Sequence, residues 1–290
     1  MNTSPRPVLI GGSGGSGTTL VADLLGRCDP VTPVYETEIV PSIALALYQG
    51  SASVPTDQRL AEVQRRMDRW LASGTEGRPH TKAPHEVYHH GPQHIRFSRD
   101  DALAATAVLV AAIRAGTPED AAFREFVHAL MAAHCRAVGK PAWVSKVPDY
   151  ALVIPLLHAL MPDTTYVDCV RDPRAVAASV LARPWGPRKP RKAGEYWAAR
   201  VRSGRRFGEE HPGAYRLVRY ERLVEDPVPE LGPVLEAMGY AVDDAVAARW
   251  RASVDPSRAE AWRRVLSPKE ARQVVHGAGA EGHVFMASRS

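Results

Sequence analysis

The stretch from Val8 to Leu25 joins a short apolar run, a glycine-rich loop and a helix-like segment. Val8 to Ile10 is apolar enough for a buried central strand, and apolar residues recur at helical spacing after Thr19. Glycine lets the loop curl so that several backbone N–H groups point at one place, and the helix N-terminus adds partial positive charge. The stretch therefore predicts a strand, loop and helix that form a phosphate cradle.

The spacing Gly12-x-x-x-x-Gly17-Thr18-Thr19 nearly matches the P-loop pattern. Thr18 stands where a nucleotide-hydrolysing P-loop has lysine. Without that ammonium group, the loop does not neutralise β- and γ-phosphate charge in the usual way. A flexible glycine turn that binds nothing is the alternative. The strand and helix patterns on both sides favour the cradle.

The length and net charge of the chain limit its fold class and the kinds of partner that it can bind. A chain of 290 residues is long enough for one large α/β domain. The net charge of +5 is modest, and a nucleic-acid partner usually calls for a denser basic face. We therefore expect no nucleic-acid partner. An anionic small ligand is compatible with this charge, and so is a purely solubilising role.

The three cysteines, Cys28, Cys135 and Cys169, are far apart and odd in number. They indicate neither a metal pair nor a disulfide framework, which fits a reducing cytoplasm. The sequence shows no secretory h-region and no apolar run long enough to span a membrane. We expect a cytoplasmic protein without a membrane partner.

Charged side chains follow two further short strands expected near residues 31–35 and 143–146. Glu36 and Glu38 follow the first of these strands, and Lys146 ends the second. Ligands of α/β proteins bind at the carboxyl ends of parallel strands, so these side chains are expected near the cradle. A carboxylate there can act as a general base. Position alone leaves two solvated acids and a surface lysine as alternatives.

A second anion-binding pattern follows the β-branched stretch 164–170, which predicts a core strand. Asp172 suits the N-cap of a following helix and Pro173 its first turn. Arg171 and Ser179 can then meet one anion, with a guanidinium fork and a hydroxyl. Arg183 lies one helical turn beyond Ser179 and can join them.

Strands that alternate with helices predict a parallel sheet covered by helices on both faces. We expect a single domain over 1–290, with a variable insertion of helices and loops at about 50–140. The long helix at 118–138 should have Thr117 as its N-cap and Gly139 as its C-terminal stop. After residue 229 we expect short helices to residue 277, anchored by Trp250, Trp262 and Leu266. The other expected helices are 42–49, 56–71, 102–115, 152–161 and 194–210, with a strand at 214–220.

The segment 73–100 has no clean periodicity and is rich in histidine. The spacing of these histidines matches no zinc pattern, and no cysteine supports one. We therefore expect no metal and interpret the segment as a polar loop or lid over an acceptor site. The histidines are His80, His85, His89, His90 and His94.

Several motifs, in their order along the chain, resemble the motifs of sulfotransferases that use 3′-phosphoadenosine 5′-phosphosulfate (PAPS). Gly14-Gly-Ser-Gly-Thr-Thr19 resembles their 5′-phosphosulfate loop, the Arg171–Ser179 segment their 3′-phosphate motif, and Arg219–Pro227 their tyrosine-containing segment. The motifs are most similar to those of tyrosylprotein sulfotransferases. Glu36-Thr-Glu-Ile-Val-Pro41 resembles the segment that carries their catalytic base, and Ser145-Lys-Val-Pro148 their lysine before a short proline segment. The likeness covers most of the chain and is thin between about 50 and 140.

The resemblance implies a P-loop-type α/β fold that moves a sulfuryl group from PAPS to a hydroxyl, leaving the product PAP, without a metal. It implies that Glu36 is the base and that Lys146, Thr18 and the loop N–H groups stabilise the transferring group. It assigns Tyr220 to the nucleotide, and Ser253 to the region where these enzymes place a loop over the donor. The residues implied in phosphosulfate binding are Gly14, Gly15, Ser16, Gly17, Thr18 and Thr19, and those implied in 3′-phosphate binding are Arg171, Ser179 and Arg183.

One departure concerns Gly15, because the resembling enzymes usually carry arginine or lysine two residues before the glycine at Gly17. Which cation stabilises the transferring group therefore stays open. Gly15 also keeps open a nucleotide-binding protein without catalysis. A P-loop kinase of a small metabolite is the other alternative, opposed by Thr18 and by the lack of an acidic strand end for Mg²⁺. We expect the acceptor to be a phenol or alcohol group of a small molecule, such as a natural product. The identity of the acceptor and the oligomeric state of the protein stay open.

Overall fold

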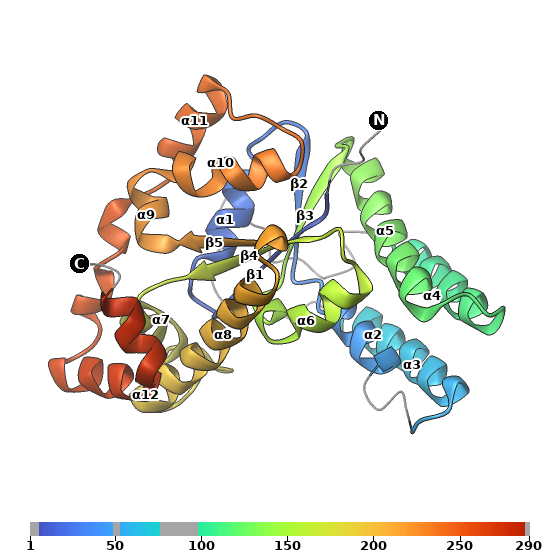
Figure 1. Ribbon diagram of the computed structural model, residues 1–290, viewed down its shortest axis with the longest axis horizontal. Coiled ribbons are helices and arrows are strands. Elements are labelled where there is room, and N and C mark those ends of the chain that lie inside the picture. The colour runs from blue at the N-terminus through green and yellow to red at the C-terminus, as the bar shows by residue number, and fades with distance from the viewer. Residues whose placement is uncertain (1–5, 49–52, 76–97, 288–290) are drawn as a thin grey trace.

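The computed structural model describes residues 6–48, 53–75 and 98–287 (Figure 1). A five-stranded sheet, all of whose paired strands are parallel, crosses the centre in the order β2-β3-β1-β4-β5. This arrangement confirms the expected α/β class with a parallel sheet. The strands are β1 (Val8–Gly12), β2 (Val31–Tyr35), β3 (Ala142–Lys146), β4 (Thr165–Val170) and β5 (Tyr215–Arg219).

Helices cover both faces of the sheet because successive strand residues point to opposite sides. On β1, Val8 and Ile10 pack with α1 (Thr18–Leu25), α10 (Pro227–Ala237) and α11 (Asp244–Arg251). Leu9 faces the other way, toward α6 (Tyr150–Leu160) and α8 (Pro190–Glu210). Trp250 anchors its face as expected, since its buried indole donates a hydrogen bond to the Leu24 carbonyl at 2.6 Å.

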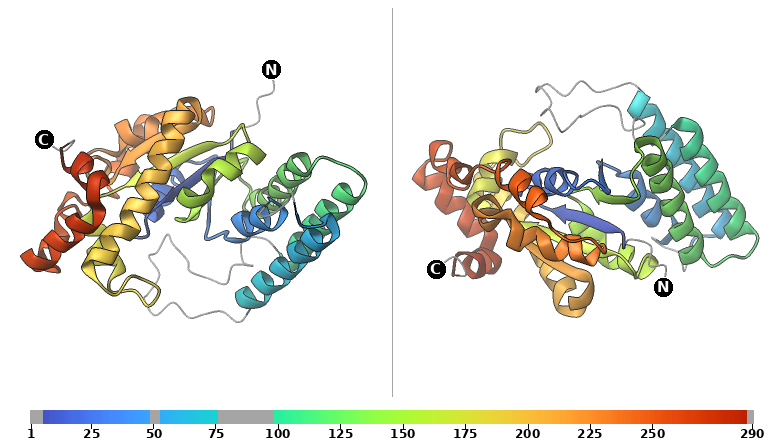
Figure 2. Two further views of the ribbon diagram at one scale, coloured as in Figure 1. Left: turned by 60° about the horizontal axis from the view of Figure 1, so that its bottom comes forward. Right: turned by 90° about the horizontal axis from the view of Figure 1, so that it is seen from above.

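The described residues of the crossover between β2 and β3 form four helices, which gather on one side of the molecule (Figures 1 and 2). Arg59 of the second helix and Glu119 of the fourth link these two helices in a bidentate pair, with N–O distances of 2.6 and 2.7 Å. The five histidines at 80–94 lie outside the described residues. The four helices are α2 (Ile39–Tyr48), α3 (Thr56–Thr75), α4 (Arg99–Arg114) and α5 (Glu119–Val138).

Some helix ends differ from the expected ones. Thr117 is not the N-cap of α5; Pro118 holds that position without a side-chain cap, whereas Gly139 ends the helix in the left-handed conformation as expected. The expectation that helices end by residue 277 is wrong, because α12 runs over Pro268–Ala287 with a break at Gly279. This helix packs along α8, at the end of the molecule away from α2–α5 (Figure 2).

A buried carboxylate, Asp168, lies on β4, the neighbour of the central strand β1. Its Oδ2 accepts a hydrogen bond from Tyr215 at 3.0 Å and its Oδ1 one from Tyr166 at 3.5 Å. Burial raises the pKa of Asp168 to about 7, although the two hydroxyls oppose this rise. The folded protein therefore binds a proton here in a pH range where the unfolded chain has released it.

We expect Asp168→Asn to reduce the pH dependence of stability. Between about pH 4 and pH 7 the folded state holds more protons at this site than the unfolded state, so stability falls as the pH rises through that window. Thermal unfolding should show the wild-type midpoint falling by several degrees more than the variant midpoint between pH 5 and pH 8. Parallel curves for the two proteins would contradict this role of Asp168.

Candidate active site

The glycine-rich loop runs from the end of β1 into α1. Gly12, Gly15 and Gly17 have φ values of 145°, 85° and 101°, which side chains rarely adopt. The hydroxyls of Ser13 and Ser16 are buried and have no hydrogen-bond partner among the described residues. Because buried polar groups are normally paired, these two donors indicate a polar ligand that belongs in the loop.

Gly15 lies directly against Ser179 of α7 (Pro173–Val180). A Cβ at Gly15 would be 2.8 Å from both Cβ and Oγ of Ser179, closer than real contacts allow. The two motifs that were far apart in the sequence therefore meet at this glycine. The same contact explains why no basic side chain stands here.

We expect Gly15→Ala and Gly15→Arg to lower thermal stability and to weaken nucleotide binding, because both the clash and the positive φ oppose a side chain. Gly116→Ala is the matched control, since Gly116 has φ 90° with nothing within 4 Å. That control should show only the cost of positive φ, about 1–2 kcal/mol. Equal destabilisation of the Gly15 and Gly116 alanine variants would show that the contact with Ser179 is unimportant.

Arg171 extends from the end of β4 under the same loop. Its Nη1 donates to the Gly15 carbonyl at 3.1 Å and its Nη2 to the Arg258 carbonyl at 2.7 Å. The guanidinium lies 3.8 Å from the ring centroid of Tyr220, whose ring also packs against Gly17. Its buried Nε has no partner among the described residues, and burial lowers the pKa of Arg171. A half-buried guanidinium with a spare donor fits an anion.

Arg183 is not placed as expected, whereas the role of Ser253 stays a prediction. The helix α7 ends at Val180, and Arg183 lies in the following turn with an exposed side chain, so it does not continue the Ser179 face. Ser253 lies in the turn after α11, and its Oγ donates to the Arg249 carbonyl at 2.6 Å. Arg258 was not predicted from the sequence, but its backbone carbonyl accepts a hydrogen bond from Arg171 and so lies at the candidate site. The turn before it gave no anion-binding signal.

Glu36 and Lys146 form an ion pair at the ends of β2 and β3. The strand register aligns Lys146 with Tyr35 on one side and with Ile10 on the other. Lys146 is buried, whereas the Glu36 side chain remains 23% exposed. Glu36 is the one non-glycine residue with positive φ, 51°, among the described residues, a strain that is typical of functional sites.

Glu38 lies beside this pair and remains exposed. Desolvation by neighbouring residues, and then the Glu36 carboxylate, raise the pKa of Glu38 to about 8. The Glu38 carboxyl group is therefore a weaker acid than usual.

Three buried hydroxyls fix the backbone around the ion pair. Thr37 Oγ1 lies 2.6 Å from Ser145 Oγ, and Tyr150 Oη lies 2.8 Å from Ser145 and 3.2 Å from Thr37. Thr37 and Ser145 are the chain neighbours of Glu36 and Lys146. The cluster thus ties the ends of β2 and β3 to α6.

The loop meets this pair at the strand ends. The Gly12 N–H donates to the Pro148 carbonyl at 3.0 Å, and the Val147 N–H donates to the Ile10 carbonyl at 3.1 Å. The structure therefore brings the loop, Glu36, Lys146, Arg171, Ser179 and Tyr220 to the carboxyl edge of the sheet.

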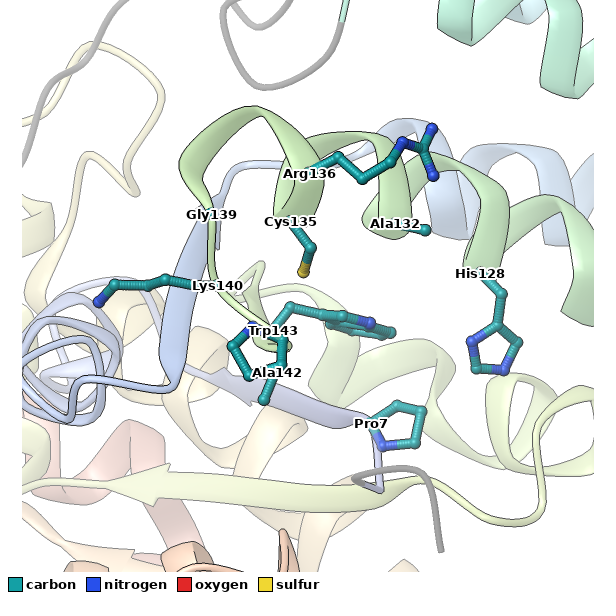
Figure 3. A pocket seen from close by; sticks show the side chains of 10 residues that line it. Pro7, His128, Ala132, Cys135, Arg136, Gly139, Lys140, Ala142 and Trp143 are labelled. Atoms are coloured by element: carbon teal, nitrogen blue, oxygen red, sulfur yellow. The ribbon is translucent and has the colours of Figure 1, made fainter. Parts of the chain in front are cut away.

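A cavity of about 600 Å³ lies at the opposite edge (Figure 3). Pro7 and Ala142, at the starts of β1 and β3, line it together with Trp143. No predicted site residue lines it. Its other lining residues are His128, Ala132, Cys135, Arg136, Gly139, Lys140 and Pro141.

Among the described residues, no three His, Cys, Asp or Glu side chains are grouped so that they could hold a metal ion. None of the helices in the same part of the chain is long and apolar enough to cross a membrane.

A parallel sheet with a glycine-rich loop between its central strand and a helix defines a P-loop-type α/β protein. The sequence matches the profile of the sulfotransferase family over residues 7–244. The chain belongs to this family. The particular likeness to tyrosylprotein sulfotransferases stays a prediction.

Individual relatives are distant. Nodulation protein NoeE of Sinorhizobium fredii is 27% identical in an alignment 201 residues long, and the match covers 54% of this chain and 47% of that protein. The chain therefore spans about half the length of this relative. The sulfotransferase domain of the Synechococcus PCC 7002 olefin synthase has a TM-score of 0.55 at 17% identity, covering 98% of this chain and 96% of that one. The sulfotransferase domain of the curacin biosynthetic pathway has a TM-score of 0.50 at 14% identity, covering 94% of this chain and 96% of that one.

Proposed function

We propose that this sulfotransferase moves a sulfuryl group from PAPS to a hydroxyl group of a small molecule. The observation that carries the proposal is the Glu36–Lys146 ion pair at the strand ends beside a glycine-rich loop. A carboxylate able to take a proton and a cation able to stabilise developing negative charge stand together there.

The residues around the loop fit a donor with two anionic ends. The unpartnered Ser13 and Ser16 hydroxyls and the N-terminus of α1 suit the 5′-phosphosulfate. On the other side of Gly15, the unpartnered Nε of Arg171 and the nearby Ser179 suit the 3′-phosphate. Tyr220 offers an aromatic surface beside Arg171 for the nucleotide. Arg183 would need to turn toward this site, and Ser253 to give up its helix contact.

The donor, when bound, supplies an activated sulfuryl group with a nucleotide bisphosphate as leaving group. Glu36 then takes the proton of the acceptor hydroxyl as that oxygen attacks in line. Lys146, now partly released from Glu36, donates to the oxygens on which charge develops. Thr18 and the loop N–H groups add fixed donors at the same place. Arg171 and Ser179 orient the donor and take no part in proton transfer.

A small-molecule acceptor is our proposal for the other substrate. Two of the structural neighbours carry names from natural-product assembly, an olefin synthase and the curacin pathway, which supports this class. The positively charged side chains bind the donor, and the acceptor approaches at Glu36. A neutral phenol or alcohol can take this position. Screening phenols and alcohols with labelled PAPS identifies the compound.

Calorimetric titration with adenosine 3′,5′-bisphosphate, in parallel with ATP–Mg²⁺, tests the proposal first. We expect preferential binding of the bisphosphate, because Arg171 and Ser179 provide for a 3′-phosphate that ATP lacks. Preferential binding of ATP–Mg²⁺ would reject PAPS as the donor. Bisphosphate binding without turnover on any acceptor would favour a protein that only binds the nucleotide.

A further inference from the structure

The loop Gly12–Thr19 contains no ionisable side chain. The contact between Gly15 and Ser179 leaves no room for one at its centre. A transferring anionic group in this loop therefore needs donors from other elements. Lys146 is one of them, and the structure offers a second on α8.

Tyr196, in the first half of α8, reaches across to the start of the loop. Its Oη accepts the Gly14 N–H at 3.0 Å, although the two residues are 182 positions apart. A phenol can accept and donate at the same time. Among the described residues no group accepts the Tyr196 O–H hydrogen, so this hydrogen is available beside the loop.

Arg200, one turn further along α8, stacks on the same ring. Its guanidinium lies 3.7 Å from the Tyr196 ring centroid, and its Nη2 holds Asp149 at 2.6 Å. The Arg200 side chain is only 12% exposed, so solvent screens its charge weakly. Burial raises the pKa of Tyr196, which keeps the phenol protonated at neutral pH, while Arg200 opposes part of that rise.

The position of Gly14 suggests which part of the donor meets this hydroxyl. Gly17 and Thr18 begin α1 and are suited to the 5′-phosphate, as helix N-termini are. Gly14 lies toward the other end of the loop, close to Gly12, which is bonded to the Pro148 carbonyl beside Lys146. The sulfuryl group must face that side to be reached from Glu36.

We propose that the Tyr196 hydroxyl donates a hydrogen bond to the sulfuryl oxygens of the bound donor, with Arg200 stacked behind it, in place of a basic side chain in the loop. This inference rests on the proposed function. It makes Tyr196 a catalytic residue and Arg200 a positioning residue that acts through it. The competing explanation is that Tyr196 only satisfies the Gly14 N–H and holds the loop in shape.

Calorimetry with two probes separates these explanations. PAPS carries the sulfuryl group, and adenosine 3′,5′-bisphosphate lacks it. For Tyr196→Phe we expect PAPS affinity to fall about tenfold, the loss typical of a hydrogen bond to a charged group. The bisphosphate affinity and the thermal midpoint should stay nearly unchanged. Tyr240→Phe is the matched control, because Tyr240 is partly buried in the α10–α11 connection and should affect neither ligand.

Arg200→Gln provides a second variant that keeps the Tyr196 hydroxyl, and it should lower PAPS affinity less, by severalfold. Equal losses for both ligands in Tyr196→Phe, with a lower thermal midpoint, would establish the purely structural explanation and overturn the inference. Unchanged binding of both ligands would also overturn it. Wild-type protein that binds neither ligand would overturn the proposed function and, with it, this inference.

Discussion

Glu36→Gln should lower the turnover of sulfuryl transfer by about 10²–10⁴-fold, the range typical of a removed general base. The amide does not accept the acceptor proton, and the strand ends that carry Glu36 and Lys146 stay fixed by the hydroxyls of Thr37 and Ser145. The measurement is kcat with labelled PAPS and the best acceptor from the screen. The affinity for adenosine 3′,5′-bisphosphate should change little, because the nucleotide contacts lie elsewhere.

Glu38→Gln is the matched control for this experiment. Glu38 is two residues away and exposed, so its amide should keep most of the activity. A thermal midpoint for each variant guards against misfolding, since Glu36→Gln leaves the buried Lys146 without its ionic partner. Unchanged turnover in Glu36→Gln, or a larger loss in Glu38→Gln, would remove Glu36 from the role of base.

Arg171→Ala should weaken binding of adenosine 3′,5′-bisphosphate by about 10²-fold, because charge-assisted hydrogen bonds to a phosphate are among the strongest in proteins. Binding of adenosine 5′-phosphate should fall only severalfold. It lacks the 3′-phosphate, but the alanine also removes the contacts of Arg171 with the Gly15 carbonyl and with Tyr220. Calorimetry with both ligands gives the comparison.

Arg171→Lys distinguishes charge from geometry. Lysine keeps the positive charge but lacks the planar fork that reaches Gly15 and Arg258 at once. We expect an intermediate loss for the bisphosphate. If the alanine variant lost affinity for both nucleotides by the same factor, Arg171 would support the loop instead of binding the 3′-phosphate.

The fold was readable from the sequence where local patterns are strong. The apolar run before Gly12, the strand before Arg171 and the caps Asp172 and Gly139 each depend on neighbours in the chain, and these elements form as expected. The order of the strands was not readable, because parallel pairs are set by crossovers of many residues. The end of α12 was missed because its long packing against α8 is a tertiary contact.

The same division holds for the site. Glu36 and Lys146 were expected near the glycine-rich loop because one follows a strand and the other ends a strand, which the local pattern indicates. Arg183 was misplaced because helical spacing was extended past the residue where the helix stops. Tyr196 was missed entirely, because it stands on a long polar helix with no motif around it. Its contact with Gly14 arises only when α8 packs across the sheet.

The four-helix crossover between β2 and β3 is structurally separate from the contacts that position Glu36 and Lys146. Backbone ladders and the Thr37–Ser145–Tyr150 hydroxyls set the spacing of Glu36 and Lys146, whereas α3 and α4 form part of one long excursion from the sheet. We therefore expect sequence changes in that excursion to leave the geometry of the reacting pair intact. A chimaera that carries the segment between Thr56 and Arg114 from a relative should keep the affinity for adenosine 3′,5′-bisphosphate.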